Sequence, residues 1–362
     1  MNLLIVTQKV DREDENLGAF YYWFEELARH AEHVTIIASS VGVHNLPSNV
    51  TIVCLEKHTG TRRLARIRKF FELFSYHYAQ SDAVFFHQIP EFVIAAAPFL
   101  LSLKKRSVLW YAHKSVTWRL KIAEKLVDFI ATSSPEGFRL PSKKVVYVGQ
   151  AINTDLFKPI GQHDTTRKNS LRLISVGRIA PVKNYEQLIE ACAAGDALWP
   201  EHWSLTLVGG PILARDYAYL ESLKRLAVQK NISQKIDFSG PARYSEIPAV
   251  LGEHDMFVNL SRTGSLDKAV FEAMACGLTV LTSNEAYRAI VPDDYFLEHA
   301  NAEFIAERIK QLAMEPRPNM ALSRIVSEHH SLAKTISRIL GLLTETEQVT
   351  NGRSVPLYIT RK

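Results

Sequence analysis

Two cations follow an apolar run in the second half of the chain, where they could bind an anion. In "SVGRIAPVKNYEQLIEA" the run ends at Val176, and Arg178 and Lys183 precede a helical pattern that begins near Asn184. A guanidinium, an ammonium group and a helix N-terminus all attract phosphate oxygens. Because charged loop residues are usually only solvated, the residues alone leave two interpretations open, a phosphate site and a pair of solvated cations.

A single carboxylate stands out in "SRTGSLDKAVFEAMACG", residues 261–277. We place Glu272 in the first turn of a helix, where the helix dipole favours a carboxylate whatever its role. The preceding loop contains Gly264, which would let the backbone approach a ligand closely. Glu272 is therefore either a ligand contact or a surface residue.

Two histidines in the first half of the chain each follow an apolar run, His87 in "VFFHQIPE" and His113 in "VLWYAHKSV". Isolated histidines are more often structural. A histidine at the carboxyl end of a parallel strand is nevertheless well placed to meet a ligand, which favours a functional role for His113 and, more weakly, for His87.

Several other kinds of site lack their sequence signatures. No histidine or cysteine cluster has metal-ligand spacing, no Asp-x-Asp occurs, and the "GxSxG" and "GxxxxGK[ST]" motifs are missing. We therefore expect no required metal and no cofactor. Three widely separated cysteines, Cys54, Cys192 and Cys276, argue against a disulfide framework and for a reducing compartment.

The elements that must position these residues follow from an alternation of apolar runs and helical patterns. The runs are "NLLIVT", "HVTIIAS", "DAVFFH", "SVLWYAH", "DFIATS" and "KKVVYVG", then "LRLISVG", "WSLTLVGG", "KIDFSG", "DMFVNLS" and "LTVLTSN". Continuous apolar runs between helices indicate parallel sheets covered on both faces. The sequence predicts an α/β fold of two Rossmann-like domains that face each other across a ligand-binding cleft.

The chain length also favours two domains, because 362 residues exceed the usual size of one core. We expect domains at residues 1–160 and 161–325, joined through the polar stretch 158–170. Residues 326–362 would form a C-terminal helix and tail that cross back to the first domain. We expect this helix to include residues 327–343, with Leu332, Ile336, Ile339 and Leu343 on one face.

Composition predicts a cytoplasmic protein. No apolar run approaches the roughly 20 residues of a membrane span, and the N-terminus lacks the order of a signal peptide. The net charge of +5 alone implies only a weak preference for anionic partners.

Several separated motifs together resemble one family. "VGRIAPVKN", "SGPARYSEIPAVLGEHDMFVNLS" and "VFEAMACGLTVLTS", in this order, are similar to the donor-binding domain of the retaining nucleotide-sugar glycosyltransferases of family four, the glycosyl transferases of group 1. "VGQAINTDLFKP" resembles the segment that joins the two domains of this family. The resemblance is strongest over residues 146–283 and implies the GT-B fold.

The resemblance implies roles for individual residues of the second domain. Arg178 and Lys183 match the pair that grips the donor diphosphate and stabilises charge on the leaving nucleotide. Gly177 belongs to the same donor-binding turn, and Glu272 matches the residue that holds the ribose hydroxyls. Arg243 ends a segment, residues 241–243, that borders the base.

In the first domain the resemblance implies that His113 lies near the transferred sugar. Gly18 matches a turn that usually has more glycines and that touches donor phosphate or acceptor. The first domain would bind the acceptor, and the second the nucleotide.

One loop departs from the family pattern. The first glutamate of a motif of two glutamates separated by seven residues is replaced by glycine. The donor-binding loop here consists of Gly264, Ser265, Leu266, Asp267 and Lys268. We expect Asp267 or Lys268 to take over part of the sugar contact, and the alternative is a mutual surface ion pair of small effect.

A basic stretch at 61–79 predicts an amphipathic helix. Leu64, Ile67, Phe71, Phe74 and Tyr78 would share an apolar face, opposite Arg62, Arg66, Lys69 and Leu73. The basic face is either solvated or binds an anionic membrane surface, which would make the protein peripheral on the cytoplasmic membrane face. Nucleic acid is not expected, because aromatic residues do not interleave with the basic ones.

Together these features predict an enzyme that moves a sugar from a UDP- or GDP-linked donor to an acceptor hydroxyl, with retention of anomeric configuration. The product would belong to glycan, glycolipid or polysaccharide synthesis, and a lipid-linked sugar is one candidate acceptor. Two alternatives stay open. One is a nucleotide-sugar epimerase, another enzyme class on the same fold, and the other is a non-catalytic protein that binds sugar nucleotides, which the missing first glutamate makes conceivable. The sequence chooses neither the base nor the acceptor.

Overall fold

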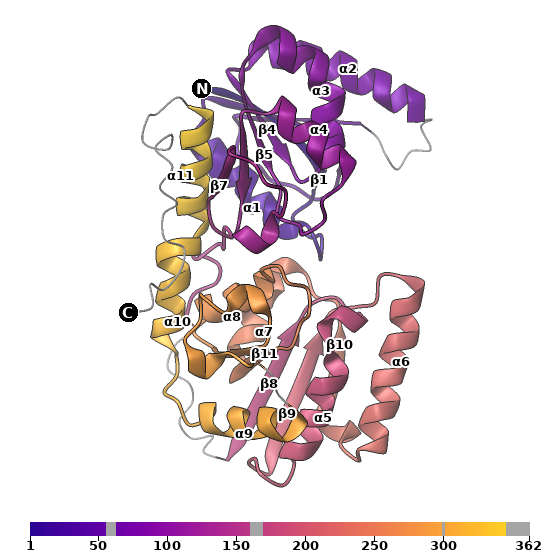
Figure 1. The fold of residues 1–362 in the computed structure, drawn as a ribbon, viewed down its shortest axis with the longest axis vertical. Coiled ribbons are helices and arrows are strands. Elements are labelled where there is room, and N and C mark those ends of the chain that lie inside the picture. The colour runs from indigo at the N-terminus through magenta and orange to yellow at the C-terminus, as the bar shows by residue number, and fades with distance from the viewer. Residues whose placement is uncertain (56–62, 160–168, 299–300, 345–362) are drawn as a thin grey trace. The chain divides into compact units, whose positions relative to one another are not determined.

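The computed structural model describes residues 1–55, 63–159, 169–298 and 301–344. The chain forms two compact units. Among the described residues, unit 1 contains Met1–Ala151 and residues 331–344, and unit 2 contains Ile152–His330. Each unit is a parallel sheet with helices on both faces, which confirms the predicted class of two Rossmann-like domains (Figure 1). Most of the linker predicted at 158–170 lies outside the described residues.

The sheet of unit 1 has seven parallel strands in the order β3-β2-β1-β4-β5-β6-β7. Their bounds are β1 Asn2–Val10, β2 His33–Val41, β3 Val50–Cys54, β4 Ala83–His87, β5 Arg106–Trp110, β6 Phe129–Thr132 and β7 Val145–Tyr147. The order reverses between β1 and β4, which is where ligands bind in open α/β sheets. The edge strand β3 was not among the predicted strands.

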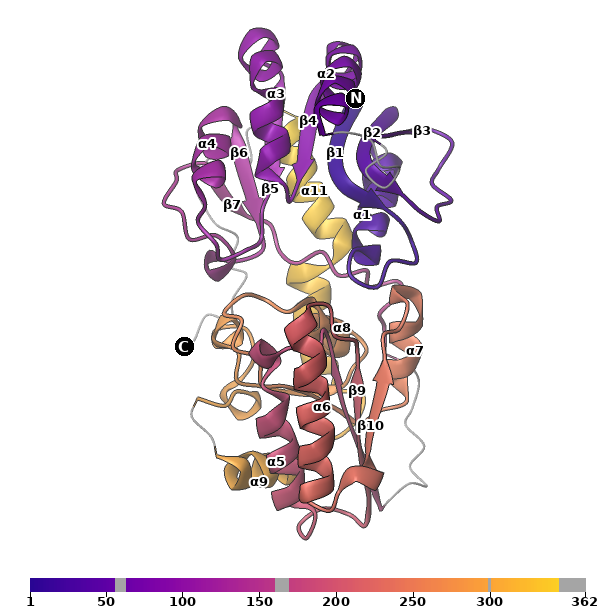
Figure 2. The same cartoon turned by 90° about the vertical axis from the view of Figure 1, so that its right-hand side faces the viewer.

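Helices cover the two faces of this sheet in separate groups (Figure 2). Leu3 and Ile5 pack with α1 (Gly18–Arg29) and α11 (Leu332–Leu343). Leu4 and Val6 point to the opposite face, because side chains alternate along a strand. That face is covered by three further helices: α2 Arg63–Gln80, α3 Pro90–Leu103 and α4 Trp118–Leu126.

The expected single helix over 327–343 is wrong, because two helical segments divide at Ser331. Val326–His330 forms a π-helical turn, η7, that follows α10 (Met320–Ile325) in unit 2. The backbone of Ser331 is extended, and α11 begins at the next residue as part of unit 1. The predicted apolar stripe of α11 is confirmed, since all four of its residues are buried in the core of unit 1.

Unit 2 contains a five-stranded parallel sheet in the order β10-β9-β8-β11-β12. The strands are β8 Ser170–Val176, β9 His202–Val208, β10 Ile236–Gly240, β11 Met256–Asn259 and β12 Thr279–Thr282. The helices are α5 Tyr185–Gly195, α6 Ala214–Gln229, α7 Ile247–Gly252, α8 Lys268–Ala275 and α9 Ala302–Leu312. Here the strand order reverses between β8 and β11, so that the carboxyl ends of these two strands mark the expected ligand site.

The predicted apolar face of α2 is partly wrong. Phe74 and Tyr78 are buried as predicted, but Leu64 is 79% exposed and Ile67 is 43% exposed. Phe70 is buried instead, because its ring stacks on Phe74 with 5.4 Å between centroids. The start of the stretch, including Arg62, lies outside the described residues. Within the described parts of the chain, no helix combines the length and apolarity needed to cross a bilayer.

Candidate functional site

In the turn after β8, the side chain of Lys183, the lysine predicted to bind phosphate, lies next to the backbone of Gly177. Gly177 has a φ of 149°, which favours glycine, and a Cβ there would lie 3.2 Å from the Nζ of Lys183. The hydroxyl of Tyr185 donates a hydrogen bond to the carbonyl of Gly177 at 3.4 Å. The missing side chain at Gly177 therefore makes room for the ammonium group of Lys183 at the end of β8.

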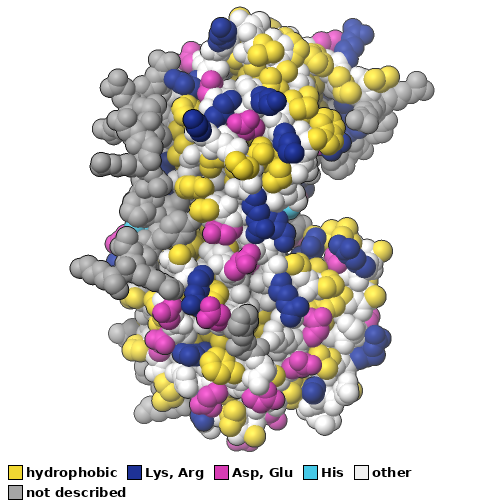
Figure 3. Space-filling model, in the orientation of Figure 1, with side chains coloured by type: hydrophobic (Ala, Val, Ile, Leu, Met, Phe, Trp, Pro, Cys, Tyr) yellow, Lys and Arg dark blue, Asp and Glu magenta, His cyan; other side chains and the backbone are white. Residues whose placement is uncertain are grey.

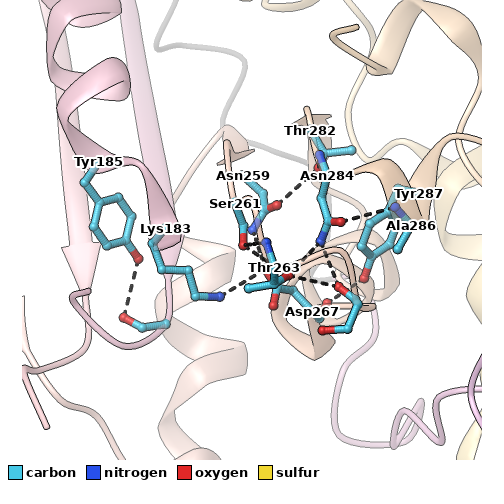
Figure 4. Close-up of polar contacts among 12 residues, drawn as sticks. Lys183, Tyr185, Asn259, Ser261, Thr263, Asp267, Thr282, Asn284, Ala286 and Tyr287 are labelled. Atoms are coloured by element: carbon cyan, nitrogen blue, oxygen red, sulfur yellow. Dashed lines mark hydrogen bonds and ion pairs between the residues drawn. The ribbon is translucent and has the colours of Figure 1, made fainter. Parts of the chain in front are cut away.

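Lys183 forms an ion pair with Asp267 across the point where the strand order reverses (Figure 4). Its Nζ lies 3.0 Å from Oδ2 of Asp267, and these side chains are 14% and 13% exposed. The amide of Asn259, the last residue of β11, donates to the same oxygen at 3.0 Å. Asp267 is therefore held between the ends of β8 and β11 and is not a solvated surface carboxylate.

Side chains from beyond β12 fix the donor-binding loop, residues 264–268. The amide of Asn284 donates to the carbonyl of Ser265 at 2.8 Å, and the hydroxyl of Tyr287 donates to the carbonyl of Asp267 at 2.5 Å (Figure 4). Gly264 has a φ of 60°, so the tight turn suits glycine. Asn284 and Tyr287 were not predicted as site residues. The position of Asn284 just past a strand end was a usable signal, whereas nothing in the sequence indicates Tyr287.

Asp267 also stands at the N-cap of α8 without capping it. Its backbone is extended, and its side chain makes no capping hydrogen bond. The carboxylate is used by Lys183 and Asn259 instead. The carboxylate of Asp267 therefore does not cap α8, whose N-terminus carries partial positive charge that favours an anion.

The prediction that Glu272 lies in the first turn of a helix is wrong. Because α8 begins at Lys268, Glu272 lies in its second turn and is only 4% exposed. Burial raises the pKa of Glu272 to about 7, although Lys268 and a hydrogen bond from Tyr244 act in the opposite direction. Its Oε1 has no hydrogen-bond partner among the described residues. A buried carboxylate oxygen without a partner is costly, and a ligand hydroxyl would satisfy it.

Lys268 lies four residues before Glu272 on the same face of α8. Burial lowers the pKa of Lys268 to about 8, and the charge of Glu272 opposes this shift. The two groups therefore titrate as a coupled pair close to neutral pH.

Arg178 is oriented by a buried carboxylate that the sequence did not predict. The guanidinium Nε lies 3.9 Å from Oδ2 of Asp216, and Arg178 is 37% exposed. Asp216 accepts a hydrogen bond from the backbone of Leu213 at 3.0 Å. This backbone bond, with the charge of Arg178, lowers the pKa of Asp216 and keeps it ionised. The place of Asp216 in the first turn of α6 was the available signal, but it equally suits a helix cap.

The segment that was predicted to border the base, residues 241–243, is followed directly by a residue that contacts Glu272. Arg243 is exposed, and its backbone N–H donates to the carboxylate of Glu246 at 3.0 Å. The next residue, Tyr244, is buried and hydrogen-bonds to Glu272. Tyr244 was not predicted as a site residue.

The site residues predicted in the first half of the chain belong to unit 1. His113 is exposed after β5, and its Nδ1 accepts a hydrogen bond from the backbone of Ser115 at 3.1 Å. Gly18 is the first residue of α1, as predicted, and its N–H donates to the carbonyl of Asp14 at 2.9 Å. Within unit 2 the structure brings Lys183 together with Asp267, and Glu272 together with Lys268, while His113 and Gly18 lie in the other unit.

His87, the weaker histidine candidate, is part of the core of unit 1. It is 3% exposed, and its Nδ1 lies 3.1 Å from the hydroxyl of Thr7. The ring of Phe20 packs against it with 4.2 Å between centroids. These contacts indicate a structural role. In the described part of the chain, no group of three or more His, Cys, Asp or Glu residues could hold a metal ion.

Comparison with known families identifies the domain that carries this site. Residues 160–327 match the family model described as glycosyl transferases group 1. This match makes residues 160–327 similar to the group 1 glycosyl transferases, the family that the sequence motifs indicated. The match includes Arg178, Lys183 and Glu272, the residues that carried the resemblance in the sequence.

Two curated relatives match part of this chain. It is 25% identical over 156 residues to one component of the phosphatidylinositol N-acetylglucosaminyltransferase of Arabidopsis thaliana. It is also 25% identical over 160 residues to the GDP-Man:Man(3)GlcNAc(2)-PP-Dol α-1,2-mannosyltransferase of Dictyostelium discoideum. The matches cover 43% and 42% of this chain but only 33% and 30% of the relatives, so the chain spans about a third of their length.

A solved structure supports the fold over the whole chain. The structure of Anabaena HepE in complex with UDP and glucose has a TM-score of 0.73 and 14% sequence identity, and the match covers 96% of this chain and 100% of HepE. At this identity the likeness shows the fold alone. Together with the two parallel-sheet units, it establishes the predicted GT-B fold for this chain.

Proposed function

We propose that this protein is a group 1 glycosyl transferase that moves a sugar from a UDP- or GDP-linked donor to an acceptor hydroxyl with retention of configuration, in glycan, glycolipid or polysaccharide synthesis. One observation carries the proposal: Lys183 is held over Gly177 at the reversal point of the sheet in unit 2, next to the start of α8. This arrangement suits a diphosphate, which needs a cation and backbone N–H donors together. The similar proteins, which include two sugar transferases and a UDP complex, support the same function.

In this proposal the cations of unit 2 act on the leaving nucleotide. Lys183 and Arg178 would bind diphosphate oxygens and stabilise the negative charge that grows as the sugar departs, without a required metal. A preorganised donor at such a position contributes about 3 to 4 kcal/mol to transition-state stabilisation. Asp216 positions Arg178 for this task, because its carboxylate lies beside the guanidinium.

Glu272 would accept hydrogen bonds from the ribose hydroxyls through Oε1, the atom without a partner in the described structure. Such hydroxyls bind an ionised carboxylate more strongly than a protonated one. The pKa of about 7 for Glu272 therefore places this contact under the control of pH near neutrality.

Asp267 would take over part of the sugar contact that the missing glutamate makes in the family. Its carboxylate is fixed at the reversal point by Lys183 and Asn259, close to the diphosphate position that we propose. A diphosphate and Asp267 would then compete for Lys183. Donor binding would weaken the Lys183–Asp267 pair and leave the carboxylate available to sugar hydroxyls.

For the chemical step we propose front-face substitution, in which the leaving phosphate helps to take the acceptor proton. The site in unit 2 offers no carboxylate that we can assign as a nucleophile, and the mechanism follows the family resemblance. A role for His113 and Gly18 of unit 1 near the sugar stays part of this proposal. Peripheral binding to an anionic membrane through residues 61–79 also stays a proposal.

A panel of UDP- and GDP-sugars tests the function by measurement of nucleotide release with and without sugar or lipid-linked sugar acceptors. Release that depends on an acceptor supports the transferase. Donor consumption without any acceptor would identify an epimerase, and nucleotide-sugar binding without turnover would identify the non-catalytic alternative that the glycine at 264 leaves open. The anomeric configuration of the product, measured by NMR, tests retention.

A further inference from the structure

Unit 1 contains an apolar cavity that the proposed donor site does not use. It has a volume of about 550 Å³ and lies among the N-terminal parts of α2, α3 and α4 and the ends of β2 and β3. Phe70, Phe71, Phe92 and Trp118 supply aromatic walls, and Ala95 of α3 leaves space between them. The cavity is therefore shaped and lined for an apolar ligand.

The apolar lining continues onto the surface of the protein. Ile67 and Trp118 line the cavity and are 43% and 61% exposed, and Leu64, one turn before Ile67 on α2, is 79% exposed. In the upper part of Figure 3, hydrophobic side chains lie among lysines and arginines over the helices of unit 1. A ligand could thus extend from the cavity along an apolar surface without a polar barrier.

The charged residues of the cavity favour an anionic head group. Arg66 and Arg119 line it together with one acid, Glu91, so the charge of these three groups is 2 − 1 = +1. Arg119 is paired with Glu91 at 3.2 Å, and its guanidinium lies 4.8 Å from the Trp118 ring centroid. The N-terminal parts of α3 and α4 that border the cavity add partial positive charge.

We propose that this cavity binds the hydrocarbon chain of a lipid phosphate, with the phosphate at Arg66 and Arg119. The inference rests on the proposed function, because it assigns the ligand as the lipid part of the acceptor. The cavity lies where the helices begin, at the carboxyl edge of the sheet of unit 1, which is the edge that binds ligands in such folds. An apolar interior with cations at its mouth matches an acyl or isoprenoid chain with an anionic head.

The test measures binding of hexyl, octyl, decyl and dodecyl phosphate by isothermal titration calorimetry, below their critical micelle concentrations. We expect the dissociation constant to fall about fourfold for each methylene until the cavity is filled. Dodecyl phosphate should bind more tightly than dodecyltrimethylammonium, which has the same chain and the opposite charge. Affinity that does not depend on chain length, or a preference for the cation, would overturn the proposal.

Two variants separate the cavity from non-specific binding. Ala95→Trp fills the cavity and should weaken binding of dodecyl phosphate at least about tenfold, because the chain loses several methylene contacts. Ala79→Trp makes the same change at an exposed position of α2 that does not line the cavity, and it should bind like the wild type. Equal affinity in both variants, at wild-type level or below it, would refute the cavity as the site.

UDP and GDP binding distinguishes this proposal from the proposed function. The nucleotide site lies in unit 2, so Ala95→Trp should bind nucleotide like the wild type, which also shows that unit 2 is folded. Far-UV circular dichroism and thermal unfolding of Ala95→Trp and Ala79→Trp control for the fold of unit 1. Loss of alkyl phosphate binding with intact nucleotide binding supports the lipid site. Alkyl phosphate binding without nucleotide binding would refute only the proposed function.

Discussion

The two sheets reverse their strand order in the same way, but they place different chemistry at that point. In unit 2 the ends of β8 and β11 hold the charged pair Lys183–Asp267. In unit 1 the corresponding point holds His87, the last residue of β4, and Thr7 of β1, which contact each other, and Phe20 packs against His87. The topology thus creates a favourable place for a ligand in both units, and the side chains decide whether it is open.

The difference shows that a polar residue at a strand end is a weak indicator of function by itself. His87 meets the positional requirement, but aromatic rings desolvate it and Thr7 satisfies its Nδ1. Lys183 is also largely buried, yet it is paired with a carboxylate, Asp267, that in our proposal a diphosphate displaces. A strand-end residue is available to a ligand only when its partner can be exchanged.

Lys183→Met should have the largest effect on catalysis. The variant keeps the length of the side chain but removes the charge that would stabilise the leaving diphosphate, and we expect kcat/KM to fall about 100- to 1000-fold. Initial rates of nucleotide release measure the change. Lys224→Met, at an exposed lysine of α6, is the matched control and should be near wild type. A donor turnover within a few-fold of wild type in Lys183→Met would contradict the assignment.

His87→Ala tests whether the reversal point of the sheet in unit 1 has a structural role. Removal of a buried ring leaves a cavity, and we expect the fold of unit 1 to lose about 2 to 4 kcal/mol of stability. Urea unfolding followed by circular dichroism measures the loss, with the two units treated as separate transitions. Nucleotide binding to the folded variant should not change. A His87→Ala protein with normal stability and weaker donor binding would show that the point in unit 1 is functional.

Glu272→Gln separates binding from stability. An ionised Glu272 accepts ribose hydroxyls better than a protonated one, so affinity for UDP or GDP should rise with pH through about 7, and this rise should be absent in the variant. The loss at pH 8 should be about 1 to 3 kcal/mol, the range for hydrogen bonds to charged groups. Calorimetric titrations at several pH values measure both.

The stability of Glu272→Gln should change in the opposite sense. Burial raises the folded-state pKa of Glu272 above its ordinary value, so the wild type loses stability as pH rises from about 4.5 to about 7. The glutamine variant should lack this loss and be the more stable protein above pH 7, as thermal unfolding would show. A variant that is less stable than wild type at pH 8 would mean that a charged Glu272 stabilises the fold.

The sequence predicted the strands of both sheets well where side chains are buried on both faces. Runs such as "NLLIVT" and "DMFVNLS" are continuous, because helices cover both sides. The edge strand Val50–Cys54 was missed although "VTIVC" is itself an apolar run, and its mostly half-buried residues reflect its position at the edge of the sheet. The stripe of α2 was misjudged for a related reason: periodicity defines an apolar face, but packing against α3 decides which part of it is buried.

The site residues that lie within one sequence motif could be predicted, whereas those contributed by other segments could not. Arg178, Lys183 and Glu272 lie in recognisable patterns, whereas Asp216, Tyr244 and Tyr287 reach the site from other elements. The sequence neighbourhoods of Asp216 and Tyr287 are ordinary, whereas Tyr244 lies inside the motif "SGPARYSEIPAVLGEHDMFVNLS", of which only residues 241–243 were assigned to the site. Only the folded chain shows that Asp267 is paired with Lys183, because the partners are far apart in sequence.

Asp267→Asn should have the smallest effect of these variants, and it should change nucleotide affinity and donor turnover in opposite directions. The amide can still accept a hydrogen bond from Asn259 or Lys183, but it no longer competes for the charge of Lys183. We therefore expect UDP or GDP to bind about two- to fivefold more tightly, equivalent to about 0.4 to 1 kcal/mol. Turnover of the sugar donor should fall, because the carboxylate that contacts the sugar is lost. Parallel losses of nucleotide affinity and turnover would instead show that Asp267 only positions Lys183. The split between the two measurements thus tests whether Lys183 at the reversal point of unit 2 has an exchangeable partner, in contrast to His87 in unit 1.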